Sequence, residues 1–304
     1  MLTKAYRSLV PEDVRYSIRR LQDPEDVGRF DILRHELVWH LSDEERLAHR
    51  RCRKLLGDRG YWCFILGVNN SGTTLLHKIL ADHEDARALP MEGQSLTRAL
   101  RRPWDHAAAR LWATQVDLFH MTEEDGPGPA WRAIHDWAFH YRGQPGHVLL
   151  EKSPPNTIRS RWLARWFQPS RFITLVRNPY AVCEGIRRRN EHPISDAARH
   201  WAVANDTLYE DLSHLPADQP VLRITYERLS EHHASVLDEI CRFLEIPNSF
   251  GDDLGPLDVH NIESRPSEIR NFNDDSIARL SAEDIRIVTE IAGETMVRLG
   301  YEPF

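Results

Sequence analysis

The sequence has few cysteines, no long apolar run and no excess of basic residues, and each absence excludes a class of protein. The four cysteines among 304 residues form no C-x-x-C pair, which indicates scattered reduced thiols rather than a disulfide framework or a zinc site. The longest apolar stretch covers residues 61–68, well short of the ~20 residues that span a membrane. A net charge of −7 argues against a nucleic-acid partner.

The amino-terminal residues also lack the apolar core of a secretory signal peptide, because residues 1–20 mix charged side chains with short apolar pieces. Apolar residues make up 41% of the chain, which is enough to bury a sizeable core. The length fits one large domain or two small ones. No group of His, Cys, Asp and Glu has the spacing of a metal site, so no metal is expected.

Short apolar runs alternate with helical stretches along most of the chain. The predicted strands cover residues 61–67, 147–150, 171–176 and 221–225. The predicted helices cover residues 42–56, 73–83, 155 onwards, 179–189, 195–212, 229–244 and 281–299, with capping boxes at Ser42 and Ser281. Because alternating strands and helices form βαβ units, the sequence predicts one α/β domain over residues 1–304, with a central parallel β-sheet flanked by helices.

Three segments lie outside this alternation. Residues 1–60 form a predicted helical extension, and residues 98–146 a predicted helical insert with a turn at 126–129. Residues 247–273 are rich in Pro and Asp and predict a long loop, a type of segment that often closes over a ligand. The tryptophans of the insert are expected to lie in the core or to line an acceptor pocket: Trp104, Trp112, Trp131 and Trp137.

A glycine-containing segment, Gly67-Val-Asn-Asn-Ser-Gly-Thr-Thr74, joins the first predicted strand to the helix that follows. Glycine lets successive backbone N–H groups turn inward and a helix N-terminus adds positive potential, so this segment is a candidate phosphate loop. Its candidate binding residues are Asn69, Asn70, Ser71, Gly72, Thr73 and Thr74. The spacing is similar to the Walker A pattern, but Thr73 replaces the lysine that an ATP-handling kinase needs. The alternative is a strand-to-helix turn without a ligand.

The segment Ser71-Gly-Thr-Thr-Leu-Leu76 resembles the donor loop of the PAPS-dependent sulfotransferase family, whose donor is 3′-phosphoadenosine 5′-phosphosulfate. The resemblance implies a P-loop NTPase-like fold, PAPS as the donor and PAP as the product. Most members place a Lys or Arg directly before the Ser-Gly pair, where this chain has Asn70. Either another cation takes over that contact, or donor binding is weakened.

The family's motif for the 3′-phosphate of the donor is similar to the run Leu175–Arg189, in which Arg177 ends a predicted strand. A guanidinium grips a phosphate with two parallel hydrogen bonds, which suits Arg177 to that role. The family usually has a serine where this chain has Gly185, so that contact is lost or passes to Asn178 or a water. Arg189 resembles a further arginine of the tyrosylprotein-type members.

The segment Glu151-Lys-Ser-Pro-Pro-Asn156 resembles the E-K-[ST]-P motif of many members. Lys152 is then expected at the carboxyl end of a strand, where it would neutralise charge on the oxygen that leaves with PAP. Glu92 follows the donor-loop helix, where tyrosylprotein-type and several bacterial members carry their catalytic glutamate, so the resemblance implies Glu92 as the general base. His77 and His120 are the alternative bases.

Two further segments, Arg223–Leu229 and Met296–Tyr301, resemble the family's R-Y-E-x-L segment and closing helix. The implied activity is in-line transfer of a sulfuryl group from PAPS to a hydroxyl or amine, on a small-molecule, glycoside or peptide acceptor and without a metal. Golgi-type members usually carry a membrane anchor. Because this sequence has no apolar run long enough for one, we expect a cytoplasmic protein. The identity of the acceptor and the oligomeric state stay open.

Two other functions also stay open. An ATP-dependent P-loop kinase would depend on Mg²⁺, and the missing loop lysine and the E-K-S-P motif argue against it. A catalytically degenerate protein of sulfotransferase fold would bind a nucleotide or a partner without turnover. Asn70 and Gly185 are the two departures from the family pattern that favour this second alternative.

Overall fold

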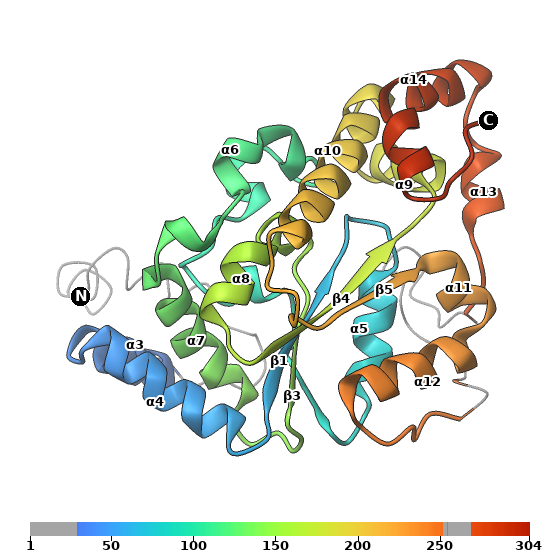
Figure 1. The fold of residues 1–304 in the computed structure, drawn as a ribbon. Coiled ribbons are helices and arrows are strands. Elements are labelled where there is room, and N and C mark those ends of the chain that lie inside the picture. Colours follow the sequence, from blue (N-terminus) through green and yellow to red (C-terminus); the bar gives the residue numbers. More distant parts are fainter. Residues whose placement is uncertain (1–28, 252–253, 255–268) are drawn as a thin grey trace.

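A five-stranded sheet forms the centre of the computed structural model, which describes residues 29–251, 254 and 269–304. The strands are β1 Tyr61–Leu66, β2 Ala86–Ala88, β3 Val148–Glu151, β4 Ser170–Val176 and β5 Val221–Thr225. Their order is β2-β3-β1-β4-β5 and every pair is parallel (Figure 1). The predicted α/β domain with a parallel sheet is confirmed. β1 lies between β3 and β4, and all its residues are buried, as its unbroken apolar sequence requires.

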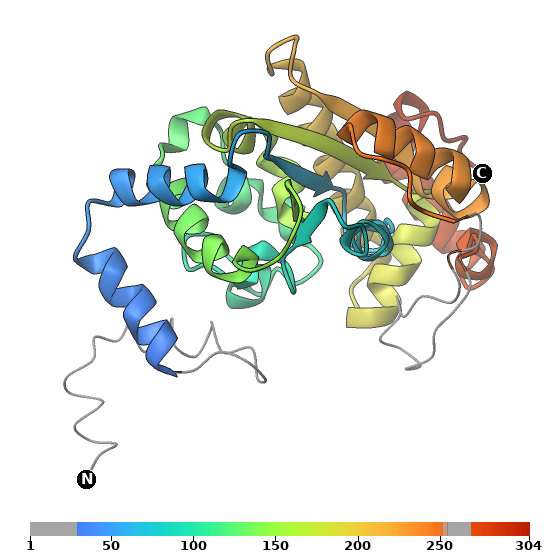
Figure 2. The same ribbon diagram turned by 90° about the horizontal axis from the view of Figure 1, so that it is seen from below.

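Helices cover both faces of this sheet (Figures 1 and 2). Those described are α3 Arg29–His40, α4 Glu44–Leu56, α5 Thr73–Ala81, α6 Val116–Phe119, α7 Gly128–Tyr141, α8 Ser160–Trp166, α9 Pro179–Asn190, α10 Ile194–Ser213, α11 Tyr226–Glu231, α12 His233–Leu244, α13 Asn273–Ile277 and α14 Ala282–Arg298. Successive side chains of a strand point to opposite faces. Trp62 and Phe64 therefore pack against α4, α7 and α8, whereas Cys63 and Ile65 pack against α5 and α12.

A third apolar cluster joins the insert to the helices near the carboxyl end of the chain. Trp112 and Phe119 of the insert belong to it, together with Trp201 on α10 and Met296 on α14. All four side chains are almost completely buried. The insert is therefore held against α10 and α14 and is part of the same domain core.

The loops after β1 and β4 lead in opposite directions. β1 leads through α5 to β2 on one side of the sheet, while β4 leads through α9 and α10 to β5 on the other side. Adjacent strands with diverging connections leave a crevice at their carboxyl ends, and open α/β sheets bind ligands there. The candidate loop Gly67–Thr74 and Arg177 both lie at this point of the sheet.

The predicted strands are confirmed with small shifts at their ends, and two helix predictions are wrong in detail. Ser42 does not cap α4; Asp43 does, because its carboxylate accepts the backbone N–H of Arg46 at 2.9 Å. The predicted helix 229–244 is two helices, since α11 ends at Glu231 and α12 begins at His233. The capping box at Ser281 is confirmed. β2 has only three residues and gives no periodic pattern to predict it from.

The predicted helical insert contains one long helix, α7, while the residues before it form short turns of 3-10 helix and the four-residue α6. Trp112 and Trp137 lie in the core, whereas the side chain of Trp104 is 71% exposed. Most of the predicted loop 247–273 falls outside the described residues. In the described ranges, no helix combines the length and the apolarity that crossing a bilayer requires.

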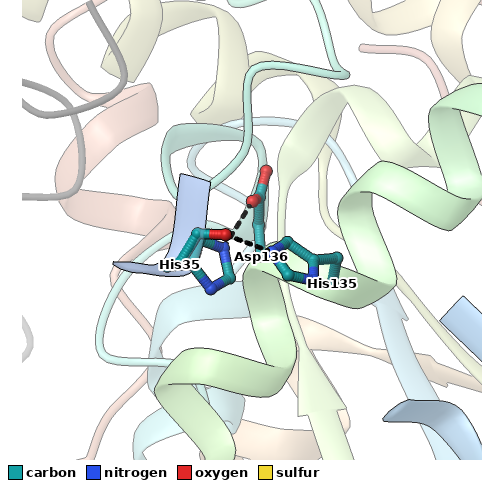
Figure 3. A group of neighbouring side chains, drawn as sticks. All are labelled: His35, His135 and Asp136. Atoms are coloured by element: carbon teal, nitrogen blue, oxygen red, sulfur yellow. Dashed lines mark hydrogen bonds and ion pairs between the residues drawn. The ribbon is translucent and has the colours of Figure 1, made fainter. Parts of the chain in front are cut away.

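A buried polar network attaches α3 to α7. Arg132 donates to Asp136 at 2.9 Å and pairs with Glu36, and His35 Nε2 lies 3.0 Å from Asp136 Oδ1. The rings of His35 and His135 stack with their centroids 3.8 Å apart (Figure 3). Burying several charges together requires that each one has a partner, and this network supplies them.

The ligand atoms of His35, His135 and Asp136 lie within 4.8 Å of one another, a spacing that would suit a metal ion. The Asp136 carboxylate, however, already accepts from Thr97 Oγ1 at 2.7 Å and from Arg132. A guanidinium beside the carboxylate repels a cation. We therefore interpret this group as a polar link between α3 and α7.

His135 and His200 are buried histidines whose protonation opposes folding. Burial lowers the pKa of each to about 3; His35 and Arg132 lower it further at His135 while Asp136 opposes them, and His192 lowers it further at His200. A histidine in the unfolded chain titrates near 6.5, so acid protonates the unfolded chain first. Stability is therefore present above pH 6.5 and is lost as the pH falls towards 3.

Between pH 7 and pH 5, we expect each of these two histidines to lower the free energy of unfolding by about 2 kcal/mol. Urea unfolding at a series of pH values measures this slope. His135→Asn removes one titrating ring and should flatten the slope, whereas His49→Asn, at an exposed position, should leave it unchanged. An unchanged slope in His135→Asn would contradict the prediction.

Candidate functional site

The loop between β1 and α5 turns through two residues in the left-handed region. Asn70 has a φ of 68° and Gly72 a φ of 93°. The Gly67 N–H donates to Thr157 Oγ1 at 2.8 Å, which fixes the start of the loop. No side chain caps α5, whose N-cap residue is Gly72, so the N–H groups of its first turn lack the side-chain partner that a capped helix has. An anion at this helix start would satisfy them.

Two residues of the insert hold the side chains of this loop. Trp112 Nε1 donates to Asn69 Oδ1 at 2.9 Å, and Arg110 Nη1 lies 3.3 Å from Asn70 Oδ1. Asn69, a predicted binding residue, thus has its carbonyl oxygen engaged by the insert. The shape of the loop depends on a segment that lies about forty residues further along the chain.

Arg177 follows β4 and contacts the loop directly. Its Nη1 donates to the Asn70 carbonyl at 2.9 Å and its Nε to Asn273 Oδ1 at 2.8 Å. The guanidinium lies over the ring of Tyr226, 4.0 Å from its centroid. Burial lowers the pKa of Arg177, while Tyr226 and Glu227 oppose this shift. The predicted phosphate arginine is therefore fixed in place with one face against an aromatic ring.

Several buried donors around this contact have no partner among the described residues. They are Asn70 Nδ2, Ser71 Oγ, Arg177 Nη2 and Arg189 Nε. A buried donor without a hydrogen bond costs about 1–3 kcal/mol, so a group of them in one place is unusual unless a ligand completes it. The loop, the residue directly after β4 and α9 supply these four donors, and every one suits a phosphate or sulfate oxygen. The residues present therefore fit a nucleotide that carries several anionic groups.

Gly185 of α9 lies against Asn70. A Cβ atom at position 185 would come within 3.2 Å of Asn70 Cγ and Nδ2. The two positions that depart from the family pattern are thus in contact, and the Asn70 amide fills the room next to a residue without a side chain. The Asn178 Oδ1 caps α9 by accepting the N–H groups of Tyr180 and Ala181, so a contact from Asn178 in place of the missing serine would come from its Nδ2 group.

Glu92 and Lys152, the predicted base and the predicted cation, form an ion pair. Lys152 Nζ lies 3.1 Å from Glu92 Oε1, and Gln94 Nε2 donates to Glu92 Oε2 at 2.8 Å. Glu92 remains partly exposed, with a third of its side chain accessible, whereas Lys152 is nearly buried. The structure therefore brings together the two residues to which the sequence assigns catalysis.

Glu151 fixes the segments that carry Glu92 and Lys152 through hydrogen bonds. The sequence motif alone did not reveal this role. Its completely buried carboxylate accepts the Gly93 N–H at 3.0 Å, Asn156 Nδ2 at 2.7 Å and the Ser153 hydroxyl. Burial raises the pKa of Glu151, and these three donors oppose the shift. One carboxylate thus fixes the backbone next to Glu92 and the turn that follows Lys152.

The two alternative bases differ from Glu92 in their surroundings. His77 lies on α5, where burial and the nearby Lys152 lower its pKa to about 4. The His120 ring pairs with Asp211 of α10 at 3.1 Å, and this partner raises its pKa. His120 therefore serves a contact between the insert and α10, while His77 is a half-buried ring whose lowered pKa keeps it neutral at pH 7.

The R-Y-E-x-L segment and the carboxyl-terminal helices support the arginine side of the site. Glu227 accepts the Asn178 N–H at 2.9 Å, Asn273 Nδ2 at 2.7 Å and the Tyr301 hydroxyl at 3.0 Å. Tyr226 packs between Arg177 and the loop at Gly72. The resemblance of residues 223–229 to a family motif was a signal for Tyr226 and Glu227, whereas nothing in the sequence pointed to Asn273 or Arg110.

Residues 63–251 match the sequence profile of the Sulfotransferase family. Protein-tyrosine sulfotransferase 1 of Danio rerio is 24% identical over 261 residues, covering 79% of this chain and 72% of the relative. Protein-tyrosine sulfotransferase 2 of Gallus gallus is 24% identical over 266 residues, covering 79% of this chain and 69% of the relative.

Two solved structures share the fold. The sulfotransferase domain of the Synechococcus PCC 7002 olefin synthase has a TM-score of 0.51 and 23% identity, over 78% of this chain and 97% of that one. A sulfotransferase from Mycobacterium tuberculosis has a TM-score of 0.53 and 12% identity, over 96% of this chain and 97% of that one.

The loop conformation makes Gly72 sensitive to substitution. A Cβ atom there would lie 2.7 Å from Tyr226 Cδ2, and the left-handed φ costs about 1 kcal/mol for any other residue. With the displaced ring adding about 1–3 kcal/mol, we expect Gly72→Ala to lower the free energy of unfolding by roughly 2–4 kcal/mol in urea.

Gly293 of α14 is the matched control, because its Cβ would meet nothing within 4 Å and its φ is that of a helix. Gly293→Ala should raise stability by about 0.5–1 kcal/mol. Equal stability of the two variants would show that the loop does not have the conformation described.

Proposed function

Because the chain belongs to the sulfotransferase family, we propose that it transfers a sulfuryl group from PAPS to an acceptor hydroxyl or amine. The observation that carries this proposal is the group of unpartnered buried donors on the loop and α9, beside Arg177. A mononucleotide with phosphates on both sides of its ribose would satisfy donors from both elements at once.

The donor would be held from two sides. We assign the N–H groups at the start of α5 and the hydroxyls of Ser71 and Thr74 to the 5′-phosphosulfate. We assign Arg177 and Arg189 to the 3′-phosphate, because both project from the segment that follows β4. The Nε and Nη1 atoms of Arg177 already donate to Asn273 and Asn70, so Nη2 is the atom that we assign to the ligand.

PAPS supplies an activated sulfuryl group, and the protein supplies positioning, a base and a cation. Glu92 takes the proton of the acceptor hydroxyl as the acceptor oxygen bonds to sulfur and the bond from sulfur to the phosphate oxygen breaks. Lys152 stabilises the negative charge on the oxygen that leaves with PAP. The contact of 3.1 Å between the two side chains keeps Lys152 directed towards the carboxylate before the acceptor arrives.

A phenolic hydroxyl is the first acceptor class to test. Two relatives are named for sulfation of protein tyrosine, and Glu92 is accessible enough to meet an acceptor from outside. The insert, with the exposed Trp104, is the segment that we propose to contact the acceptor. Small phenols, glycosides and tyrosine-containing peptides are therefore the panel for a transfer assay.

The donor assignment is tested by thermal unfolding with PAP and with ATP plus Mg²⁺, added separately. PAP at 100 times its Kd adds about 2.7 kcal/mol, which for a domain of this size raises the melting temperature by roughly 5 °C. Arg177→Ala should remove that shift. A shift with ATP alone would instead support the kinase, which Thr73 in place of the loop lysine argues against.

The proposed role of Glu92 is tested by measuring nucleotide binding and sulfuryl transfer separately. Glu92→Gln should leave the PAP shift intact and lower sulfuryl transfer by about 100-fold or more, because it removes the proton acceptor and leaves the proposed donor-binding residues unchanged. Glu124→Gln, at an exposed position in the insert, is the control. Undiminished transfer by Glu92→Gln would exclude Glu92 as the base, and PAP binding without transfer to any acceptor by the wild-type chain would support the degenerate alternative.

A further inference from the structure

The loop between β1 and α5 has no cation of its own. Its residues Gly67–Thr74 include neither Lys nor Arg. Backbone N–H groups and a helix start carry only partial charges, whereas a phosphosulfate brings full negative charge. A cation from elsewhere in the chain would therefore strengthen binding at this loop.

Arg110 reaches the loop from the insert. Its Nη1 lies 3.3 Å from Asn70 Oδ1, and this is its one hydrogen bond among the described residues. A guanidinium has five N–H donors, so one long hydrogen bond leaves most of its donor capacity unused. The backbone of Arg110 has a φ of 61°, a left-handed conformation that bulky residues rarely adopt and that concentrates at functional sites.

The charges around Arg110 favour an anion beside it. Burial lowers the pKa of Arg110, the charge of Arg189 lowers it further, and Glu92 opposes both effects. Glu92 is already engaged by Lys152 and Gln94. A half-buried guanidinium within the field of another arginine is costly in the free protein, and a bound anion would lower that cost.

The position of Arg110 distinguishes it from the other arginines of the site. Arg177 is fixed between Asn70 and Asn273, and Arg189 lies on α9. Arg110 instead contacts the side chain of Asn70 in the loop, and the charge of Glu92, the proposed base, raises the pKa of Arg110. It therefore lies on the side of the site where the sulfuryl group is transferred.

We propose that Arg110 binds the 5′-phosphosulfate of the donor and supplies the positive charge that the loop lacks. Asn70 positions Arg110 through its Oδ1, and Gly185 leaves the room in which the Asn70 amide lies. This inference rests on the proposed function, because it assigns one more contact to the same donor.

The test compares variants that lack Arg110 or Arg177 with nucleotides that lack either the 3′-phosphate or the 5′-phosphate. Affinities for PAP, adenosine 3′-monophosphate and adenosine 5′-monophosphate are measured by calorimetry for the wild-type chain and for Arg110→Ala, Arg110→Lys and Arg177→Ala. Arg199→Ala, an exposed arginine of α10, is the control. Residues and ligand groups that contact each other show non-additive losses in such a cycle.

Arg110→Ala is expected to bind PAP and adenosine 5′-monophosphate roughly 10- to 100-fold more weakly, the loss of one charge-assisted hydrogen bond, and adenosine 3′-monophosphate as tightly as the wild type. Arg177→Ala is expected to show the opposite preference. Arg110→Lys should retain part of the affinity. Without ligand, Arg110→Ala should unfold at the same or a higher urea concentration, because it removes a half-buried charge close to Arg189.

Three results would overturn the role of Arg110. They are unchanged affinity of Arg110→Ala for PAP, an equal loss for all three nucleotides, or a loss confined to adenosine 3′-monophosphate. A less stable Arg110→Ala with an unaltered nucleotide preference would likewise show a structural role only. Failure of the wild-type chain to bind PAP would instead overturn the proposed function, so the two failures are distinguishable.

Discussion

A buried carboxylate at the end of β3 holds the transfer side of the site together. Glu151 lies one residue before Lys152 and accepts the N–H of Gly93, one residue after Glu92. The same carboxylate accepts from Asn156, whose Oδ1 in turn accepts from the guanidinium of Arg159 at 3.1 Å. A charge in this position has no access to water, so its donors must come from the protein. The segment after α5 and the turn after β3 are therefore held at a fixed distance.

The part of the site that we propose for the nucleotide has a different support. Arg177 donates hydrogen bonds to the Asn70 carbonyl and to Asn273 Oδ1. The Asn273 amide in turn donates to the Glu227 carboxylate. These residues come from four separate parts of the chain, which the divergent connections of β1 and β4 bring to one end of the sheet. The sheet thus places these segments side by side, while hydrogen bonds that carboxylates and side-chain amides accept fix the individual side chains.

The sequence predicted the parts of the fold in which local pattern and tertiary structure agree. The apolar run Tyr61–Leu66 and the capping box at Ser281 are local, and both are found as predicted. Glu92 and Lys152 were assigned by resemblance, and their ion pair joins residues sixty positions apart. The insert was predicted as helical from a helical, Trp-rich pattern, but core packing of Trp112 against α10 accommodates 3-10 turns equally well. Arg110 carries no local signal, because its importance lies in a contact with Asn70 across the fold.

The contacts that Trp112 and Arg110 make with Asn69 and Asn70 mean that the insert is not an exchangeable module. A chimera that receives the insert of a relative in order to test the proposed acceptor role would also lose the two side chains that hold the loop Gly67–Thr74. Residues 69–70 and the 110–112 turn therefore have to be transplanted together. The hydrogen bonds from Trp112 and Arg110 thus link any change in the insert to the conformation of the loop.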